Sequence, residues 1–174
     1  RDEDDKQGYG GAPITNEGAG GEIYGTIYYM VESPHEQGTI WTGSDDGLIH
    51  LTRDDGATWT ALGIREVFPM TYPRGIMVQP GSPNVIFVTI GDTTPGRTGT
   101  IMRSTDTGKT WESLPLPVQP NTAMWVVNMQ PSDPKVVFAG SRYGYLYHSQ
   151  DGGDSWSKLW REFSEISSVI WVPN

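Results

Sequence analysis

Three copies of one octapeptide decide how this chain folds: TRDDGATW at residues 52–59, STDTGKTW at 104–111 and SQDGGDSW at 149–156. They share the pattern S/T-x-D-x-G-x-S/T-W. A short apolar run of the kind that forms a β-strand stands just before each copy, at 48–51, 101–102 and 145–147. A motif that recurs after a strand in this way indicates a protein built from equivalent repeated units.

A proline recurs in step with the octapeptide. Pro34 lies 25 residues before Trp59, and Pro131 lies 25 residues before Trp156. In the second copy the same interval is 31 residues, and the six additional residues fall in GDTTPGRTG at 91–99. The second unit therefore carries a loop insertion on an otherwise equal repeat.

Each unit is predicted to hold four strands. The first ends at the proline, the second lies between the proline and the octapeptide, the third precedes the octapeptide, and the fourth begins at its tryptophan. The period is about 45 to 50 residues, which together with the strand count is typical of a β-propeller blade. The segment VIWVP at 169–173 predicts the first strand of one further blade.

The chain is thus expected to be all-β, with three complete blades and the first strand of a fourth, as part of a larger ring. Its first residues are acidic and glycine-rich, which favours an arm or loop. The predicted segments are the arm or loop at 1–24, blades at 25–66, 67–118 and 119–160, and the start of the next blade at 161–174.

Composition excludes several classes of function. The 174 residues include 12 Lys and Arg against 21 Asp and Glu, a net charge of -9 that repels phosphate backbones, so we expect no nucleic-acid partner. There is no cysteine for a disulfide or thiolate site, and no apolar run is long enough for membrane insertion. His35, His50 and His148 show no metal-site spacing, so neither a metal nor another cofactor is expected.

The octapeptides are interpreted as structural. The aspartate can accept hydrogen bonds from its own turn, the glycine can supply a positive φ, and the tryptophan can be buried between adjacent units. The alternative, a catalytic or calcium-binding role, is disfavoured because an active site needs one special constellation and not three near-identical copies. The structural residues are Thr52, Asp54, Gly56, Thr58, Trp59, Ser104, Asp106, Gly108, Thr110, Trp111, Ser149, Asp151, Gly153, Ser155 and Trp156.

The octapeptide resembles the Asp-box, or BNR repeat, of sialidases, sortilin-type propellers, some xyloglucan-active glycosidases and photosystem II assembly-factor-like proteins. The resemblance covers residues 25–174 and implies a β-propeller of four-stranded Asp-box blades. The first third of the chain is also similar to large secreted bacterial BNR-repeat proteins that are often labelled glycosyl hydrolases. This likeness implies a secreted or periplasmic location, although the chain contains no signal peptide.

The resemblance does not imply sialidase activity. Sialidases place an arginine in an F/Y-R-I-P motif before the first Asp-box, and the nearest segment here, YPRGI at 72–76, has another order and follows that box. An inverting glycosidase would need two carboxylates across a cleft, one with a raised pKa. No spacing singles out a pair among the candidates Asp45, Asp46, Asp92, Glu162 and Glu165.

Binding is the favoured function. Trp125, Arg142, Tyr143 and Arg161 form the candidate binding surface, because aromatic and guanidinium groups can stack on sugar rings or anchor a protein. We therefore expect a non-catalytic binding or scaffold module that recognises a protein or glycan through its rim or axial face. The alternative is a glycoside hydrolase whose catalytic carboxylates lie partly outside this chain. The remainder of a larger propeller, or an oligomeric partner, is expected to complete the ring.

Overall fold

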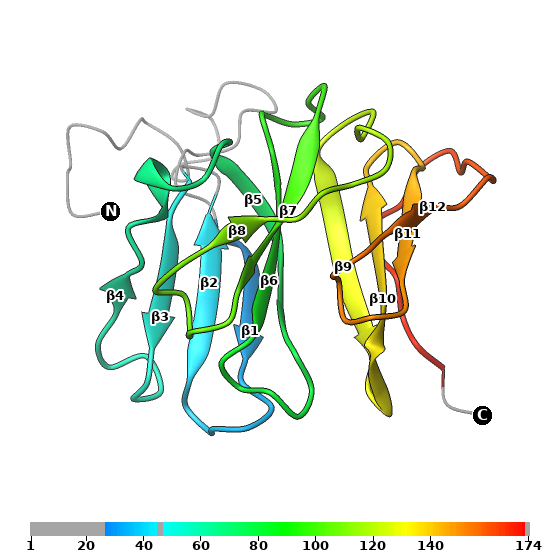
Figure 1. The fold of residues 1–174 in the computed structure, drawn as a ribbon. Coiled ribbons are helices and arrows are strands. Elements are labelled where there is room, and N and C mark those ends of the chain that lie inside the picture. The colour runs from blue at the N-terminus through cyan, green and yellow to red at the C-terminus, as the bar shows by residue number, and fades with distance from the viewer. Residues whose placement is uncertain (1–26, 45–46, 173–174) are drawn as a thin grey trace, which may run out of the picture.

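The computed structural model describes residues 27–44 and 47–172. The acidic segment 1–24 and the candidates Asp45 and Asp46 lie outside the described residues. Within them the chain forms three four-stranded antiparallel sheets that stand side by side in chain order (Figure 1). The described residues contain no α-helix, and one 3-10 turn, η3 (Ile64–Glu66), precedes the second sheet. The prediction of an all-β fold is confirmed.

Each sheet is a meander of four strands. The first sheet contains β1 (Ile27–Glu32), β2 (Ile40–Ser44), β3 (Ile49–Thr52) and β4 (Thr60–Ala61). The second contains β5 (Tyr72–Val78), β6 (Ile86–Gly91), β7 (Gly99–Ser104) and β8 (Glu112–Ser113). The third contains β9 (Met124–Gln130), β10 (Asp133–Ser141), β11 (Leu146–Ser149) and β12 (Ser157–Lys158). The fourth strand of each sheet has only two residues and begins directly after the octapeptide tryptophan.

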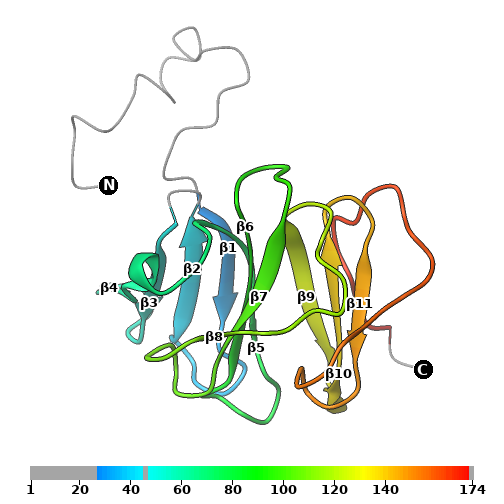
Figure 2. The same ribbon diagram turned by 45° about the horizontal axis from the view of Figure 1, so that its top comes forward.

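Two hydrophobic cores fill the spaces between successive sheets. Because side chains alternate along a strand, β6 sends Ile86 and Val88 to the core shared with the first sheet, and Phe87 to the core shared with the third. All six residues of β6 are buried for this reason. The first strand of each following sheet completes the contact, since β5 packs on β1 and β2, and β9 packs on β5 and β6. This is the face-to-face stacking of propeller blades (Figure 2).

The octapeptide tryptophans do not share one environment. Trp111 lies edge-on to Phe68 at 5.1 Å between the ring centroids, and Trp156 is 9% exposed in the core between the second and third sheets. Trp59 is 43% exposed, so the expectation that all three rings are buried between units is wrong for this residue. Trp111 and Trp156 each pack toward the preceding sheet. Among the described residues, no sheet precedes that of Trp59.

The segment after β12 differs from the sequence prediction. Residues 169–172 form no strand, because the described residues supply no second strand of a further sheet with which they could pair. The segment nevertheless crosses the third sheet. Asn128 donates its side-chain N–H to the Val169 carbonyl at 2.7 Å, and the Trp171 ring lies 5.6 Å from that of Phe138. This path is comparable with that of β5 across the first sheet and β9 across the second.

Candidate functional site

Each octapeptide closes a hydrogen-bonded turn around its aspartate. In the third copy Ser149 donates its hydroxyl to Asp151 Oδ1 at 2.7 Å and accepts the Gly153 N–H at 2.9 Å. Ser155 donates its N–H to Asp151 Oδ1 at 2.9 Å and its hydroxyl to Oδ2 at 2.5 Å. Gly153 has a φ of +96°, and its carbonyl accepts the indole N–H of Trp156 at 2.9 Å. Apart from the indole bond, the first copy makes the same set of bonds, and the second makes all of them.

These bonds stabilise the ionised carboxylates. The hydroxyl and N–H of Thr110, with further help from Ser104 and Lys109, lower the pKa of Asp106 from 3.8 to about 2. The pKa of Asp54 is lowered first by the Thr58 hydroxyl, and that of Asp151 by the Ser155 hydroxyl. A carboxylate held in this state is a poor general acid. The geometry therefore supports the structural interpretation of the three turns.

A pocket lined by arginine and aromatic side chains opens where the first strands of the three sheets begin. Tyr28 lies in β1, Tyr72 is the first residue of β5, and Trp125 is the second residue of β9. The cavity has a volume of about 360 Å³. We call it the Arg–aromatic pocket; its lining residues are Tyr28, Tyr72, Arg74, Thr94, Pro95, Trp125, Arg142 and Tyr143.

Two guanidinium groups cover the indole ring in this pocket. The Cζ atom of Arg74 lies 3.5 Å from the centroid of Trp125, and that of Arg142 lies 4.4 Å from it. Arg74 also stands 4.0 Å from the centroid of Tyr28. A cation over an aromatic face is attractive, so these contacts fix the rings and the arginines together. The Trp125 ring is therefore not the open stacking surface for sugars that the sequence suggested.

The pocket wall is held by backbone hydrogen bonds from two hairpin loops. The Ala123 N–H donates to the Pro95 carbonyl at 3.0 Å, and the Ala123 carbonyl accepts the Arg142 N–H at 3.0 Å. The Tyr143 N–H donates to the Thr122 hydroxyl at 3.1 Å. In Figure 2 the β6–β7 and β10–β11 loops rise at the same end of the sheets. The site is thus assembled from both loops and the strand starts beneath them.

The structure brings together three of the four residues expected at a binding surface. Trp125, Arg142 and Tyr143 share the pocket, whereas Arg161 stands outside it with its Cζ 5.9 Å from the centroid of Phe163. The remaining lining residues were missed. Tyr28, Tyr72 and Arg74 are distant in sequence from Trp125, and Thr94 and Pro95 belong to the insertion at 91–99. An alignment of the three repeats could have indicated them, because they lie at the starts of equivalent strands or in equivalent loops.

The candidate catalytic carboxylates in the described residues have other roles. Glu162 pairs with Lys158 at 2.9 Å, and Glu165 pairs with Arg142. Burial acts to raise the pKa of Asp92, but the N–H groups of the following turn, foremost that of Arg97, hold it below the ordinary value. No carboxylate belongs to the described lining of the Arg–aromatic pocket. These side chains do not form the pair of opposed carboxylates that an inverting glycosidase needs.

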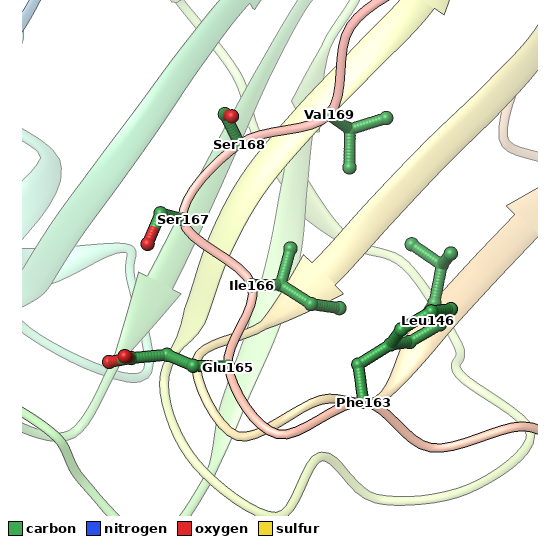
Figure 3. Close-up of a pocket in the computed structure, with 7 residues that line it drawn as sticks. All are labelled: Leu146, Phe163, Glu165, Ile166, Ser167, Ser168 and Val169. Carbon is green, nitrogen blue, oxygen red and sulfur yellow. The ribbon is translucent and has the colours of Figure 1, made fainter.

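A second cavity, also of about 360 Å³, lies under the last segment of the chain. Figure 3 shows Phe163, Ile166 and Val169 on one side of this segment, toward Leu146, with Glu165 and Ser167 directed to the other side. The apolar side chains pack the segment onto the third sheet, where a Cβ on Gly140 would lie 3.0 Å from Ile166 Cγ2. This cavity is therefore a gap in the packing of the segment.

Neither a metal centre nor a membrane span is found in the part of the chain that the structure describes. Across residues 27–44 and 47–172, no group of three or more His, Cys, Asp or Glu side chains is placed to hold a metal ion. No helix of the same residues is long and apolar enough to cross a membrane.

The stacked four-stranded sheets and their hydrogen-bonded turns define an Asp-box β-propeller protein. A family model described as "Sortilin, neurotensin receptor 3" (Sortilin-Vps10) matches residues 47–171. The chain therefore belongs to the Sortilin-Vps10 family of BNR/Asp-box propellers.

The curated relatives are much longer proteins. Xyloglucanase Xgh74A of Acetivibrio thermocellus is 30% identical over 173 aligned residues, which cover 90% of this chain and 20% of the relative. A xyloglucanase of a Paenibacillus species is 26% identical over 82% of this chain and 15% of its own length. The chain thus spans about a fifth of the curated relatives that it matches.

Solved structures show the same fold at lower identity. An ancestral GH74 enzyme superposes with a TM-score of 0.65 at 20% identity, over 83% of this chain and 19% of that one. YCF48 bound to D1 peptide superposes with a TM-score of 0.58 at 21% identity, over 78% of this chain and 40% of that one.

Proposed function

We propose that the chain is a non-catalytic binding module of the Asp-box propeller type, exported from the cell, that takes a protein or glycan ligand through the Arg–aromatic pocket. The observation that supports this proposal is the convergence of all three sheets and two loops on one cavity. A module that serves only as a scaffold would not need such convergence. The position of the pocket at the strand starts supports recognition through the axial face over recognition through the rim.

The pocket is chemically prepared for a ligand rich in hydrogen-bond acceptors. Its polar side chains include two guanidinium groups, which can only donate, and three tyrosine hydroxyls. The hydroxyl of Tyr28 is buried and has no hydrogen-bond partner within residues 27–44 and 47–172. A buried polar group without a partner is costly, so a ligand oxygen that accepts this hydroxyl proton would be favoured.

The relatives offer one example of each ligand class. The curated relatives are named as xyloglucanases, enzymes that act on a glycan, and one YCF48 structure contains a D1 peptide. The same propeller scaffold therefore accommodates both kinds of polymer. Because the aromatic face of Trp125 is covered by arginines, we expect recognition here to depend on hydrogen bonds and charge more than on stacking.

The second candidate is a glycoside hydrolase. The 30% identity to a xyloglucanase favours it, and the described carboxylates do not. In that case the catalytic pair lies partly outside this chain, and the Arg–aromatic pocket binds substrate beside it.

Binding and hydrolysis can be measured on the same samples. The chain would be titrated with xyloglucan oligosaccharides and with a panel of peptides by calorimetry, and the oligosaccharide samples assayed for new reducing ends. We expect binding without sugar release. Tyr28→Phe, which removes only the hydroxyl, should weaken affinity by about threefold to tenfold. Arg161→Ala, outside the pocket, is the matched control and should bind normally. Sugar release would overturn the non-catalytic proposal, and unchanged affinity in Tyr28→Phe would overturn the location of the site.

The outward faces of the first and third sheets suggest further partners. Trp59 on the first sheet and Ile170 and Val172 beside the third are exposed. We propose that additional blades cover these faces, supplied by the remainder of a larger ring or by an oligomeric partner. A native mass matching a stable, compact 19.2 kDa monomer would contradict this proposal.

A further inference from the structure

The insertion in the second repeat is built into the Arg–aromatic pocket. Thr94 and Pro95, two residues of this β6–β7 loop, line the same cavity as Trp125. The loop therefore does more than connect two strands, because it forms one wall of a cavity that all three sheets reach. What this wall excludes depends on how firmly it is held.

Asp92 holds the loop in a closed turn. Its Oδ1 atom accepts the N–H groups of Thr93 at 3.1 Å, Arg97 at 3.0 Å and Thr98 at 3.4 Å. The Asp92 N–H in turn donates to the Thr98 carbonyl at 3.4 Å. Gly96 has a φ of +76°, and a Cβ on it would lie 2.4 Å from Asp92 Oδ1, so the carboxylate fills the centre of the loop.

The closed loop is also fitted tightly against the third sheet. A Cβ on Gly91 would lie 2.3 Å from Ala123 Cβ, and one on Gly99 would lie 2.4 Å from the Met124 nitrogen. Gln119 donates its side-chain N–H to the Thr98 hydroxyl at 3.0 Å. The glycines therefore let the loop base approach β9 closely, and Pro95 can accept the Ala123 N–H. Ala123 connects this bond to Arg142, on the opposite wall of the pocket.

We propose that the loop 92–98 is the selectivity wall of the Arg–aromatic pocket and that Asp92 is its positioning residue. The wall limits the width of the group that enters the pocket beside Trp125 and its two arginines, so that a slender segment of a ligand enters and a bulky one does not. This inference deepens the proposed function and rests on it for its biological meaning. The wall itself is a property of the chain that can be measured without knowing the natural ligand.

The test compares the access of a small and a bulky quencher to Trp125. Acrylamide and the nitroxide 4-hydroxy-TEMPO would each be titrated against the intact chain, and the Trp125 contribution obtained by difference from Trp125→Phe. We expect Asp92→Ala to raise nitroxide quenching of Trp125 by about threefold or more, because hydrogen bonds to a charged acceptor are lost and the loop opens. Acrylamide quenching should change little, since we expect a molecule as small as acrylamide to enter the closed pocket as well.

Matched variants separate positioning from a general loss of structure. Asp133→Ala is the control, because this exposed aspartate accepts one backbone N–H from Lys135 in the β9–β10 hairpin and lies outside the pocket. Asp92→Asn keeps a side-chain oxygen acceptor and should restore most of the exclusion. If Asp92→Ala does not fold, Thr94→Gly removes a wall side chain while leaving the bonds to Asp92 intact, and should raise nitroxide quenching alone.

The selectivity wall would be overturned by unchanged nitroxide quenching of Trp125 in a folded Asp92→Ala protein. If Asp92→Ala does not fold, unchanged nitroxide quenching in Thr94→Gly would overturn it. An equal rise of nitroxide quenching in Asp133→Ala would also overturn it. The failure of every oligosaccharide and peptide to bind the unaltered chain would instead overturn the proposed function. It would leave the selectivity wall in place, because the quenching ratio does not depend on a natural ligand.

Discussion

The first and third octapeptide turns are nearly identical in their hydrogen bonds and opposite in their surroundings. The threonine hydroxyl donates to Asp54 at 2.6 Å in the first, and the serine hydroxyl donates to Asp151 at 2.5 Å in the third. Yet Trp59 is 43% exposed and Trp156 is 9% exposed. The turn is therefore a local structure that forms in this chain whether its tryptophan is buried or exposed. The burial of its tryptophan requires a neighbouring sheet.

The largest expected effect of this difference is on the tryptophans themselves. Trp156→Ala should lower the free energy of unfolding by about 3–5 kcal/mol, because it empties a buried site in the core between the second and third sheets. Trp59→Ala should cost less than about 2 kcal/mol, since much of that ring is already in water. Guanidinium chloride unfolding of both variants measures the difference. Equal losses would show that the two turns are not distinguished by burial.

Substitution of the turn glycines should also destabilise the third turn more than the first, with a smaller difference between the two variants. Gly56→Ala and Gly153→Ala both force alanine to a positive φ, which costs about 1 kcal/mol. A Cβ on Gly153 would in addition lie 2.9 Å from Phe87 Cε1, whereas a Cβ on Gly56 meets nothing closer than the ring of Trp59 at 3.5 Å. Thermal unfolding should therefore give a lower Tm for Gly153→Ala than for Gly56→Ala. The reverse order would mean that Phe87 moves aside without cost.

Acid should affect the three turns in the same direction, because similar hydrogen bonds lower the pKa of each aspartate. The pKa of Asp106 is lowered from 3.8 to about 2 in the folded chain, so its ionised form stabilises the fold at pH values above 3.8. That contribution is lost as the pH falls through about 2. Carboxyl NMR titration should show this low value, and Thr110→Val should move it up toward 3.8 by removing the hydroxyl donor. A pKa that stays low in Thr110→Val would contradict the assigned cause.

The smallest expected effect concerns an ion pair between the second and third sheets. Arg103 on β7 pairs with Glu112 at 2.8 Å and with Asp154, in the third octapeptide, at 2.6 Å. Asp154 is largely exposed, so Asp154→Ala should cost less than about 1 kcal/mol, and the loss should shrink in high salt. Leu51 is the residue before the first octapeptide, as Arg103 is before the second, and it provides no such charge. A loss unaffected by salt would exclude an ionic origin.

The sequence predicted most of the fold and part of the site. The spacing of Pro34 and Trp59, repeated in the third unit, was enough to define four-stranded units, because strand and turn signals are local. It could not show that Trp59 is exposed, or that residues 169–172 form no strand, because both depend on which sheet lies next to them. Trp125 and Arg142 were expected at a surface, but their contact with each other and with Arg74 was not.

The sequence by itself determined the repeat, the number of sheets and the bonding of each turn. The hydrogen bonds of a turn such as 149–156 involve only residues within a few positions of its aspartate, so the same residue pattern produces the same bonds each time. The tertiary structure decided which tryptophans are buried and which side chains meet in the Arg–aromatic pocket. Tyr28, Arg74 and Trp125 come from three different sheets, and only the stacking of those sheets brings them within contact distance.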